Sequence, residues 1–329
     1  MTGAITDSAL LERLGSEIDG RALAGFERRP YRYATSAPLE EIVVRYEGGG
    51  DLTLILKDLA RERLLGDAPR AKPEFLYDPR REVEAYRGIL GPAGIGPRCY
   101  AAVADDGQWL LLEKAPGIEL WQVGEFDEWE AVAVWLGAFH AEFLGREADL
   151  RGANRFLLEH DSDWFRSWHG RATDALASSE DERAGALLDA LRGYDEVVHA
   201  LASLPRTLVH GEFYPSNVLV THGTQPLKVF PVDWEMAAVG PGIVDLAAIA
   251  GGWSGEEREG LARAYLDGLE EAGARGLGWG DLLGDLTRCR LHVALQWLGW
   301  AADWRPPREH AHDWLSEALQ LCEDLGLAR

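Results

Sequence analysis

The residues that could do chemistry in this chain gather in the stretch from residue 208 to residue 235. His210 and Glu212 precede a short apolar run, Asn217 comes five positions after Glu212, and Asp233 follows the next apolar run. Oxygen atoms of one or two such side chains usually hold Mg²⁺ in proteins, and phosphates and water supply its remaining ligands. The residue types and their spacing therefore indicate a magnesium site with a further carboxylate nearby.

The two apolar runs, residues 217–220 and 228–232, are the elements that must position these side chains. A turn containing Thr, Gly, Gln and Pro joins them, which predicts a β-hairpin. Such a hairpin is small and rigid. It would place Asn217 and Asp233 on loop ends at one of its two ends.

The same spacing occurs in protein kinases, where an acid, an Asn five positions later and an Asp after the next strand do the chemistry. The letters HGE and VDWE resemble the aminoglycoside phosphotransferase and choline kinase family, whose loop reads His-Gly-Asp. The resemblance implies that Asn217 and Asp233 hold Mg²⁺ and that Glu212 is the base or orients the attacking hydroxyl. It also implies that His210 and Asp245 support the catalytic loop.

The alternative is that HGE opens an ordinary strand, with a solvent-facing Glu and a capping Asn. VDWE at hairpin spacing matches the kinase pattern independently and favours the kinase interpretation. One departure remains, because Glu212 stands where the family has Asp, and the extra methylene displaces the carboxylate by roughly 1 Å. Three explanations are open: a pocket reshaped for a recessed hydroxyl, a nucleotide-binding regulatory module without transfer, or another nucleotide transfer such as adenylylation.

The first third of the chain predicts a small sheet. Strand-like runs occupy residues 31–34, 41–46 and 52–58, and residues 100–103 and 109–113 form a further hairpin. The glycine run at residues 48–50 is a hairpin turn rather than a phosphate loop, because it lacks the following Lys-Ser/Thr and precedes a strand. The turn at residues 35–38 is better placed to cover phosphates.

The family pattern assigns nucleotide-binding roles to four residues of this region. Lys57 ends a strand and would contact the α- and β-phosphates. Glu82, on a helix that starts at Asp78-Pro79, would pair with Lys57. The adenine would lie against backbone groups near Glu113 and Ala115, in the linker between lobes. Residues 61–72, which are basic and contain Pro, are expected to be a flexible insertion.

The rest of the chain is predicted to be mainly helical. His140 lies beside an apolar stripe and is expected to be a packed core histidine. A helix predicted at residues 288–304 is apolar on two faces, and its polar line includes His292 and Gln296. A helix enclosed in this way needs partners for its polar side chains, or a cavity beside them. His292 and Gln296 are therefore either structural hydrogen-bonding residues, the favoured interpretation, or part of an acceptor pocket.

Composition restricts the class of protein. The chain has 329 residues, 47% of them hydrophobic, and 13 Trp, which excludes general disorder. A net charge of −22 argues against a nucleic-acid partner. It could attract a cationic aminosugar, although an acidic surface that aids solubility is the favoured explanation.

We also expect a cytoplasmic protein with no membrane association. No apolar run approaches the roughly 20 residues of a membrane span, and the first residues show no signal peptide. The three scattered cysteines of the sequence fit a reducing compartment.

Together these observations predict an α+β, two-lobed protein-kinase-like fold. Residues 1–112 would form an N-terminal lobe with a small antiparallel sheet, and residues 113–329 a larger, mainly helical C-terminal lobe with the catalytic loop and acceptor pocket. The expected activity is an ATP- and Mg²⁺-dependent transfer of phosphate to a small-molecule hydroxyl, on an aminoglycoside-like compound, a sugar or an amino alcohol. The acceptor, the preference for ATP or GTP and the oligomeric state stay open.

Overall fold

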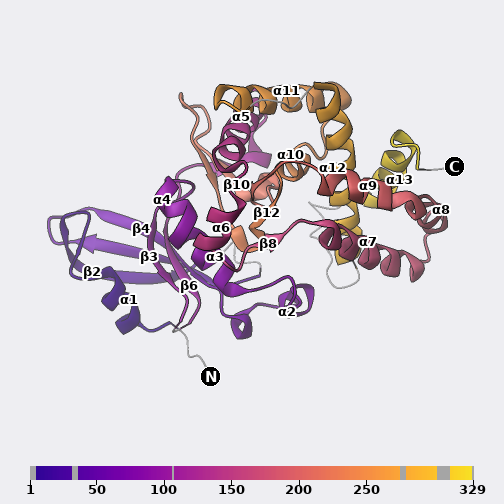
Figure 1. Ribbon diagram of the computed structural model, residues 1–329. Coiled ribbons are helices and arrows are strands. Elements are labelled where there is room, and N and C mark those ends of the chain that lie inside the picture. Colours follow the sequence, from indigo (N-terminus) through magenta and orange to yellow (C-terminus); the bar gives the residue numbers. More distant parts are fainter. Residues whose placement is uncertain (1–4, 32–35, 106, 275–278, 302–311, 328–329) are drawn as a thin grey trace. The chain divides into compact units, whose positions relative to one another are not determined.

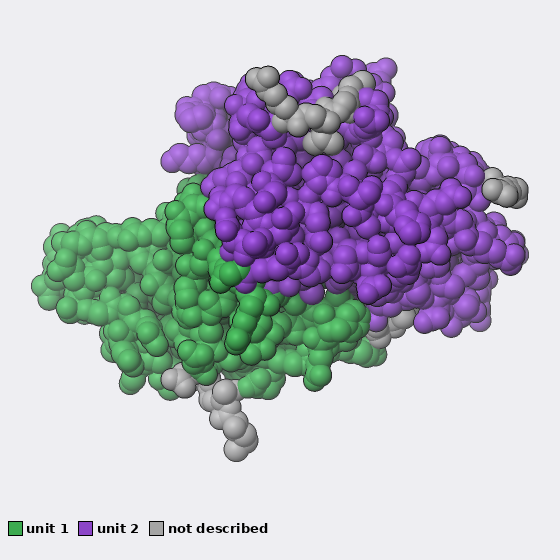
Figure 2. Space-filling view, viewed as in Figure 1, with its two compact units in different colours: residues 1–117, 152–156, 230–236 green, residues 118–151, 157–229, 237–329 purple. Residues whose placement is uncertain are grey.

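The computed structural model describes residues 5–31, 36–105, 107–274, 279–301 and 312–327. The chain divides into two compact units, which Figure 2 colours separately. Unit 1 comprises Met1–Gly117, Gly152–Phe156 and Phe230–Met236, and unit 2 comprises Ile118–Arg151, Leu157–Val229 and Ala237–Arg329. The expected boundary between an N-terminal and a C-terminal lobe, at residues 112 and 113, stays a prediction. Among the described residues, every helix is too short or too polar to cross a membrane.

Unit 1 contains a six-stranded antiparallel sheet with the order β1-β2-β3-β4-β6-β5 (Figure 1). Its strands are β1 (Glu17–Ile18), β2 (Arg21–Pro30), β3 (Leu39–Tyr46), β4 (Asp51–Asp58), β5 (Cys99–Val103) and β6 (Trp109–Glu113). The predicted hairpin of β5 and β6 and the strands β3 and β4 are present. β2 was missed, because most of its side chains are exposed or half-buried and do not alternate between apolar and polar.

The helical segments of unit 1 are short. They are α1 (Asp7–Leu14), η1 (Arg61–Arg63), α2 (Ala68–Ala71), α3 (Pro79–Ala85), the continuing turn η2 (Tyr86–Leu90), α4 (Gly91–Ala93) and η6 (Trp234–Met236). The helix expected from residue 7 to about residue 20 ends at Leu14, because Gly15 takes a left-handed φ of 70° and β1 follows. Of the strand expected at residues 31–34, only Tyr31 lies within the described residues, and it belongs to no strand.

The insertion at residues 61–72 is ordered, which corrects the expectation that it is flexible. Leu64, Ala68 and Ala71 are buried, and the main chain forms η1 and α2. These apolar side chains can pack against the rest of the unit. The expectation was based instead on the basic residues and the Pro of the segment. Burial of small apolar side chains therefore decides its structure.

Unit 2 is mainly helical. Its helices are α5 (Phe126–Phe143), α6 (Glu147–Ala153, which ends beyond the unit boundary), α7 (Ser162–Ala177), α8 (Ala184–Ala190), α9 (Tyr194–Ala202), α10 (Ile243–Ile249), α11 (Gly255–Glu271), α12 (Trp279–Trp300) and α13 (Trp314–Asp324). The helix expected at residues 186–201 is broken by the turn η4 (Leu191–Gly193) into α8 and α9. Glycine is a poor helix former, which explains a break that ends at Gly193.

Short strands and turns of unit 2 carry the loops on which predicted site residues lie. They are β7 (Ile118–Glu119), η3 (Leu120–Gln122), β8 (Leu158–Glu159), β9 (Arg206–Val209), η5 (Pro215–Asn217), β10 (Val218–Val220) and β12 (Ala238–Pro241). β12 pairs parallel with β8 and antiparallel with β9. The predicted hairpin is formed by β10 and β11 (Val229–Pro231), and Thr221 N–H donates to Lys228 O at its turn.

Candidate active site

In unit 1, Lys57 lies at the centre of an ion-pair network that joins three segments distant in sequence. Its ammonium lies 2.7 Å from Glu82 Oε2 and 2.6 Å from Asp233 Oδ1. Lys57 projects from the central strand β4, where it is paired with Leu39 and Leu110 of the neighbouring strands. The sheet therefore fixes the main chain that carries the ammonium.

Local sequence explains why Glu82 meets Lys57. The Asp78 side chain accepts a hydrogen bond of 3.0 Å from Arg80 N–H, so it caps α3, and Pro79 occupies the first helical position. Glu82 lies in the first turn and is 1% exposed. Glu84 pairs with Arg87 at 2.7 Å on the exposed side instead.

The ionised form of Lys57 is favoured by its neighbours. Burial lowers the pKa of Lys57, but the carboxylates of Asp233 and Glu82 outweigh burial and raise that pKa well above its usual value. Burial raises the pKa of Glu82, and the Lys57 ammonium opposes the rise. We therefore treat Lys57 as a permanent cation at neutral pH.

The segment that carries Asp233 has an unusual backbone. Asp233 has a φ of 67°, a left-handed conformation that is uncommon for residues other than glycine. Trp234, which follows, is fully buried, and its indole N–H donates to Pro231 O at 3.2 Å. Arg81 Nη1 donates to the main-chain oxygen of Glu235. The contacts of Trp234 and Glu235, the two residues that follow, hold Asp233 in a backbone conformation associated with functional sites.

The expected adenine-binding linker follows β6. Glu113 is the last residue of that strand, and its N–H donates to Arg98 O at 2.7 Å. Lys114 N–H donates to Thr53 O at 3.1 Å, so pairing with β4 continues past the strand end. Ala115 lies two residues beyond β6. The nucleotide-binding roles of Glu113 and Ala115 stay predictions.

In unit 2, the loop that carries His210 and Glu212, which is the expected catalytic loop, is held by one buried carboxylate. Asp245, which α10 carries, is 0% exposed. Its two carboxylate oxygens accept hydrogen bonds of 2.7 Å from His210 N–H and 2.9 Å from Gly211 N–H. Gly211 has a φ of 84°, which favours glycine at that position. The supporting contacts expected of Asp245 are therefore present.

The loop also fixes Glu212 and Asn217 through main-chain atoms. Glu212 O accepts hydrogen bonds of 2.7 Å from Tyr214 N–H and 3.0 Å from the Asn217 side-chain amide. His210 Nδ1 accepts a hydrogen bond of 3.3 Å from Glu212 N–H. Because the Asn217 side-chain nitrogen is used in this way, its oxygen is the atom left to face another ligand.

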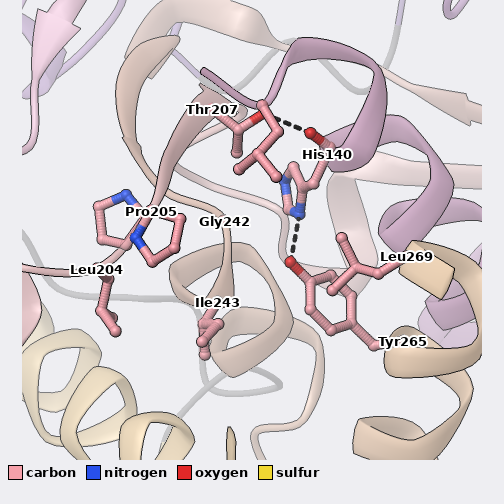
Figure 3. Close-up of a pocket in the computed structure, with 10 residues that line it drawn as sticks. His140, Leu204, Pro205, Thr207, Gly242, Ile243, Tyr265 and Leu269 are labelled. Carbon is pink, nitrogen blue, oxygen red and sulfur yellow. Dashed lines mark hydrogen bonds between the residues drawn. The ribbon is translucent and has the colours of Figure 1, made fainter. Parts of the chain in front are cut away.

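Two residues that support the loop were not assigned a role from the sequence. His140 Nε2 lies 3.3 Å from Asp245 Oδ2, and His140 Nδ1 lies 3.0 Å from the Tyr265 hydroxyl. Figure 3 shows the His140 and Tyr265 side chains directed toward each other, and Thr207, which donates to His140 O at 2.7 Å. His140 is buried, as expected, but it also connects α11 to the catalytic loop.

Close packing of α5 and α11 makes this connection possible. A Cβ atom at Gly137 would lie 2.1 Å from Tyr265 O, and one at Gly268 would lie 2.0 Å from Val134 O. Only glycine allows so close an approach. In the sequence, the only signal for this contact was that His140 lies one turn from Gly137 in an apolar helix. The partner helix could not be identified from the sequence.

A small cavity lies beside His140 and Tyr265 and is lined mainly by apolar residues (Figure 3). Its volume is about 20 Å³, enough for one water molecule and too small for a substrate. The cavity therefore belongs to the packing behind the loop.

His292 and Gln296 are placed in the interior of unit 2, at 0% and 1% exposure. His292 Nδ1 lies 3.3 Å from the Tyr194 hydroxyl, and the ring meets Phe165 edge-on at 4.7 Å. Burial lowers the pKa of His292 well below its usual value, and nearby His160 adds to the effect. His292 therefore has a hydrogen-bonding partner in Tyr194, as the structural interpretation expects. The role of His292 and Gln296 in an acceptor pocket stays a prediction.

The described residues fit a magnesium ion that takes most of its ligands from phosphates and water. Within them, no group of three or more His, Cys, Asp or Glu side chains could hold a metal by itself. The Asp233 carboxylate and the Asn217 amide oxygen are hard oxygen ligands, the kind Mg²⁺ prefers. Taken separately, Asp233 in unit 1 and Asn217 in unit 2 each offer the type of oxygen ligand that suits a metal arriving with a nucleotide.

Comparisons with known proteins identify the family. Residues 42–283 match the model of a phosphotransferase enzyme family, APH. Among curated protein sequences, none matches this chain significantly.

Solved structures with the same fold act on different compounds. An ethanolamine kinase of Plasmodium vivax is 15% identical, with a TM-score of 0.59 over 95% of this chain and 84% of that one. A macrolide 2'-phosphotransferase of Brachybacterium faecium is 18% identical, with a TM-score of 0.56 over 95% and 96%. A GDP complex of aminoglycoside 2'-phosphotransferase IIIa is 13% identical, with a TM-score of 0.58 over 98% and 97%. At these identities the similarity shows the two-lobed kinase-like fold.

Proposed function

This chain belongs to the phosphotransferase enzyme family, and we propose that it transfers the γ-phosphoryl group of ATP, bound with Mg²⁺, to a hydroxyl of a small molecule. The contact of the Lys57 ammonium with both Glu82 and Asp233 carries the proposal. The ammonium that would bind phosphate lies 2.6 Å from the carboxylate that would bind the metal. Phosphoryl transfer depends mainly on positioning and on neutralising charge, which such an arrangement supplies.

Each residue of the network has a separate task. Lys57 binds phosphate oxygens, and Glu82 orients Lys57 by holding its ammonium at 2.9 and 2.7 Å. Asp233 and Asn217 are oxygen ligands for the metal. Bound Mg²⁺ supplies charge neutralisation at the β- and γ-phosphates.

Glu212 acts on the acceptor. Its carboxylate receives or orients the proton of the attacking hydroxyl, while its main chain is fixed by Tyr214 and Asn217. The loop around it is held by Asp245, so the carboxylate starts from a defined backbone position. Precise positioning of this kind supplies much of the rate in such reactions.

The acceptor is a hydroxyl compound such as an aminosugar, another sugar or an amino alcohol. Relatives of equal similarity act on ethanolamine, macrolides and aminoglycosides by their names, so similarity does not select among these classes. The GDP found in one relative supports nucleotide binding in the same fold. Whether ATP or GTP is the donor is decided by measurement.

The first experiment is thermal unfolding with and without Mg-ATP. A nucleotide that binds only the folded chain raises its melting temperature by mass action. We expect a shift that requires both ATP and Mg²⁺. The absence of any shift at saturating concentration contradicts every form of the proposal.

The second experiment screens hydroxyl compounds for ATP consumption. Release of ADP with a phosphorylated acceptor supports the kinase. Release of pyrophosphate instead identifies adenylylation. Binding of Mg-ATP with no transfer to any compound supports the regulatory alternative, which is one of the three explanations of Glu212 in place of the family's Asp.

A further inference from the structure

A second lysine of unit 1, Lys72, has no role in the family pattern yet lies in the charged network. Its ammonium lies 2.6 Å from Glu235 Oε2 and 2.8 Å from Ser36 Oγ. The Lys72 side chain is 17% exposed and that of Glu235 is 10% exposed. The ammonium also lies 5.4 Å from the centre of the Tyr77 ring. Lys72 therefore connects two segments that are far apart in the sequence.

Lys72 ends an ordered segment, residues 61–72, which we call the brace. Arg61 Nη1 donates to Lys72 O at 2.8 Å, so the two ends of the brace are tied together. Leu65 N–H donates to Ser36 O at 2.9 Å. A small hydrophobic cluster joins the brace to its neighbours and consists of Ala37, Leu64, Ala68 and Tyr77. The brace thus fixes the main chain at Ser36 and Ala37 before the ammonium of Lys72 is considered.

Glu235, the other partner, lies two residues after Asp233. Burial lowers the pKa of Lys57, while Asp233, Glu82 and then Glu235 raise it, so the charge of Glu235 reaches the Lys57 site. Lys72 supplies a positive charge in direct contact with Glu235. A buried carboxylate that loses its partner is strongly unfavourable. Lys72 therefore neutralises Glu235, and the Lys57 ammonium pairs with Glu82 and Asp233.

We propose that Lys72 is a positioning residue for the triphosphate and its metal ion. Its ammonium ties the turn that includes Ser36 to the segment that carries Asp233. The inference rests on the proposed function, because it concerns the binding of Mg-ATP to unit 1. Residues 35–38 were expected to cover the phosphates; Thr35 lies outside the described residues, and Ser36 is the residue that Lys72 holds.

The position of Lys72 predicts an effect on the outer phosphates and not on the nucleoside. Asp233 and the turn at Ser36 act, under the proposed function, on the phosphates and the metal. AMP lacks the β- and γ-phosphates, so its binding reports the adenosine end. If Lys72 is a positioning residue, its loss lowers the affinity for Mg-ATP and leaves the affinity for AMP unchanged. If its role is generally structural, its loss lowers both affinities.

The test is isothermal titration calorimetry of Lys72→Met with Mg-ATP and, separately, with AMP. We expect Mg-ATP to bind about tenfold more weakly, the effect of losing one charge-assisted contact. AMP affinity should stay within about twofold of the wild type, which on the free-energy scale is less than a third of the effect on Mg-ATP. Lys72→Arg should recover part of the Mg-ATP affinity, because a guanidinium also pairs with a carboxylate.

A second variant separates the lost contact from the buried charge left behind. Lys72→Met combined with Glu235→Gln removes both charges of the pair. If Lys72 acts through Glu235, the loss of Mg-ATP affinity in the double variant is smaller than the sum of the two single losses. Ser36→Ala removes the other contact without leaving a buried charge and should weaken Mg-ATP alone.

Arg63→Met is the matched control. Arg63 belongs to the same brace and pairs with Asp58 at 3.3 Å, with its side chain 39% exposed. Because Asp58 is buried and adjacent to Lys57, Arg63→Met is combined with Asp58→Asn, which removes both charges of the pair and leaves Ser36 and Glu235 untouched. Both affinities should stay at the wild-type values.

The outcomes are distinguishable. A wild-type chain that fails to bind Mg-ATP overturns the proposed function itself. A wild-type chain that binds, with Lys72→Met binding Mg-ATP equally well, overturns only the role of Lys72. Equal weakening of Mg-ATP and AMP also overturns it, since that pattern reports general structure. If Lys72→Met does not fold, the double variant and Ser36→Ala decide.

Discussion

The charged network in unit 1 and the loop at residues 210–217 in unit 2 are held by different kinds of interaction. In unit 1, the side chains of Lys57, Glu82 and Asp233 hold each other by charge. In unit 2, the buried Asp245 holds main-chain N–H groups of His210 and Gly211. The first arrangement consists of side chains alone, and the second of backbone N–H groups and one side chain.

The difference matches what the proposed function requires of each region. A nucleotide and a metal carry charge into unit 1, so its ion pairs must exchange partners when they bind. The catalytic loop must keep one geometry throughout, because a displacement of about 1 Å in a reacting group can lower the rate about 10²-fold. Ion pairs permit exchange, whereas buried backbone hydrogen bonds resist it.

Glu212→Gln should give the largest effect on turnover. The amide keeps the shape of the side chain but cannot accept the hydroxyl proton, so turnover should fall about 10²–10⁴-fold. ATP affinity should be almost unchanged, because Glu212 acts on the acceptor. Steady-state rates with the identified acceptor and titration of Mg-ATP check the two halves. Unchanged turnover removes Glu212 from the mechanism.

Glu212→Asp sharpens the same test. If Glu212 reaches a recessed hydroxyl, the shorter Asp should lower turnover. If Glu212 instead marks a kinase that has lost activity, Asp should give equal or faster transfer. The comparison uses the same acceptor and nucleotide concentrations for both variants.

Asp245→Asn should lower turnover about 10²-fold, through misplacement of Glu212. The amide nitrogen cannot accept a backbone N–H, so one buried donor loses its partner and the free energy of unfolding falls by about 1–3 kcal/mol. Kinetics and urea unfolding measure the two effects. His140→Phe, which removes one contact to Asp245, should show a smaller decrease in turnover. Full activity in Asp245→Asn contradicts the rigid-loop interpretation.

Asp233→Ala should abolish the Mg²⁺-dependent part of nucleotide binding and leave the fold intact. Lys57 keeps Glu82 as its partner in this variant, so no buried charge is left alone. Asn217→Ala should have the same effect on metal dependence. Calorimetry with and without Mg²⁺ makes the measurement, and circular dichroism checks the fold. Normal Mg-ATP binding by both variants shows that the metal assignment is wrong.

The smallest expected effect concerns acid stability and belongs to unit 2. The pKa of His292 is lowered by burial, so below about pH 6.5 the unfolded chain binds a proton that the folded chain does not. Stability is therefore lost as pH falls through that range, with this group contributing at most about 1.4 kcal/mol per pH unit. His292→Gln should reduce the slope of unfolding free energy against pH. An unchanged slope contradicts the expectation.

The sequence alone determined the fold class and the family. The periodicity of β3, β4 and α3 and the spacing of HGE, Asn217 and VDWE are local signals, and they predicted a kinase-like phosphotransferase that the family comparison confirms. The contact of Lys57 with Glu82 was expected from the family pattern and is present. Their roles, like those of the other proposed site residues, await the experiments above.

Only the tertiary structure decided which distant residues support the site. The link from Tyr265 to His140 and Asp245 depends on two helices packed through Gly137 and Gly268, and no spacing in the sequence encodes which helices meet. The brace is ordered because Leu64 and Ala68 are buried against Ala37 and Tyr77. The charge and Pro content of the segment did not reveal these contacts in the sequence. Local patterns report the period of an element, whereas contacts between elements arise from packing of surfaces that come together only in the folded chain.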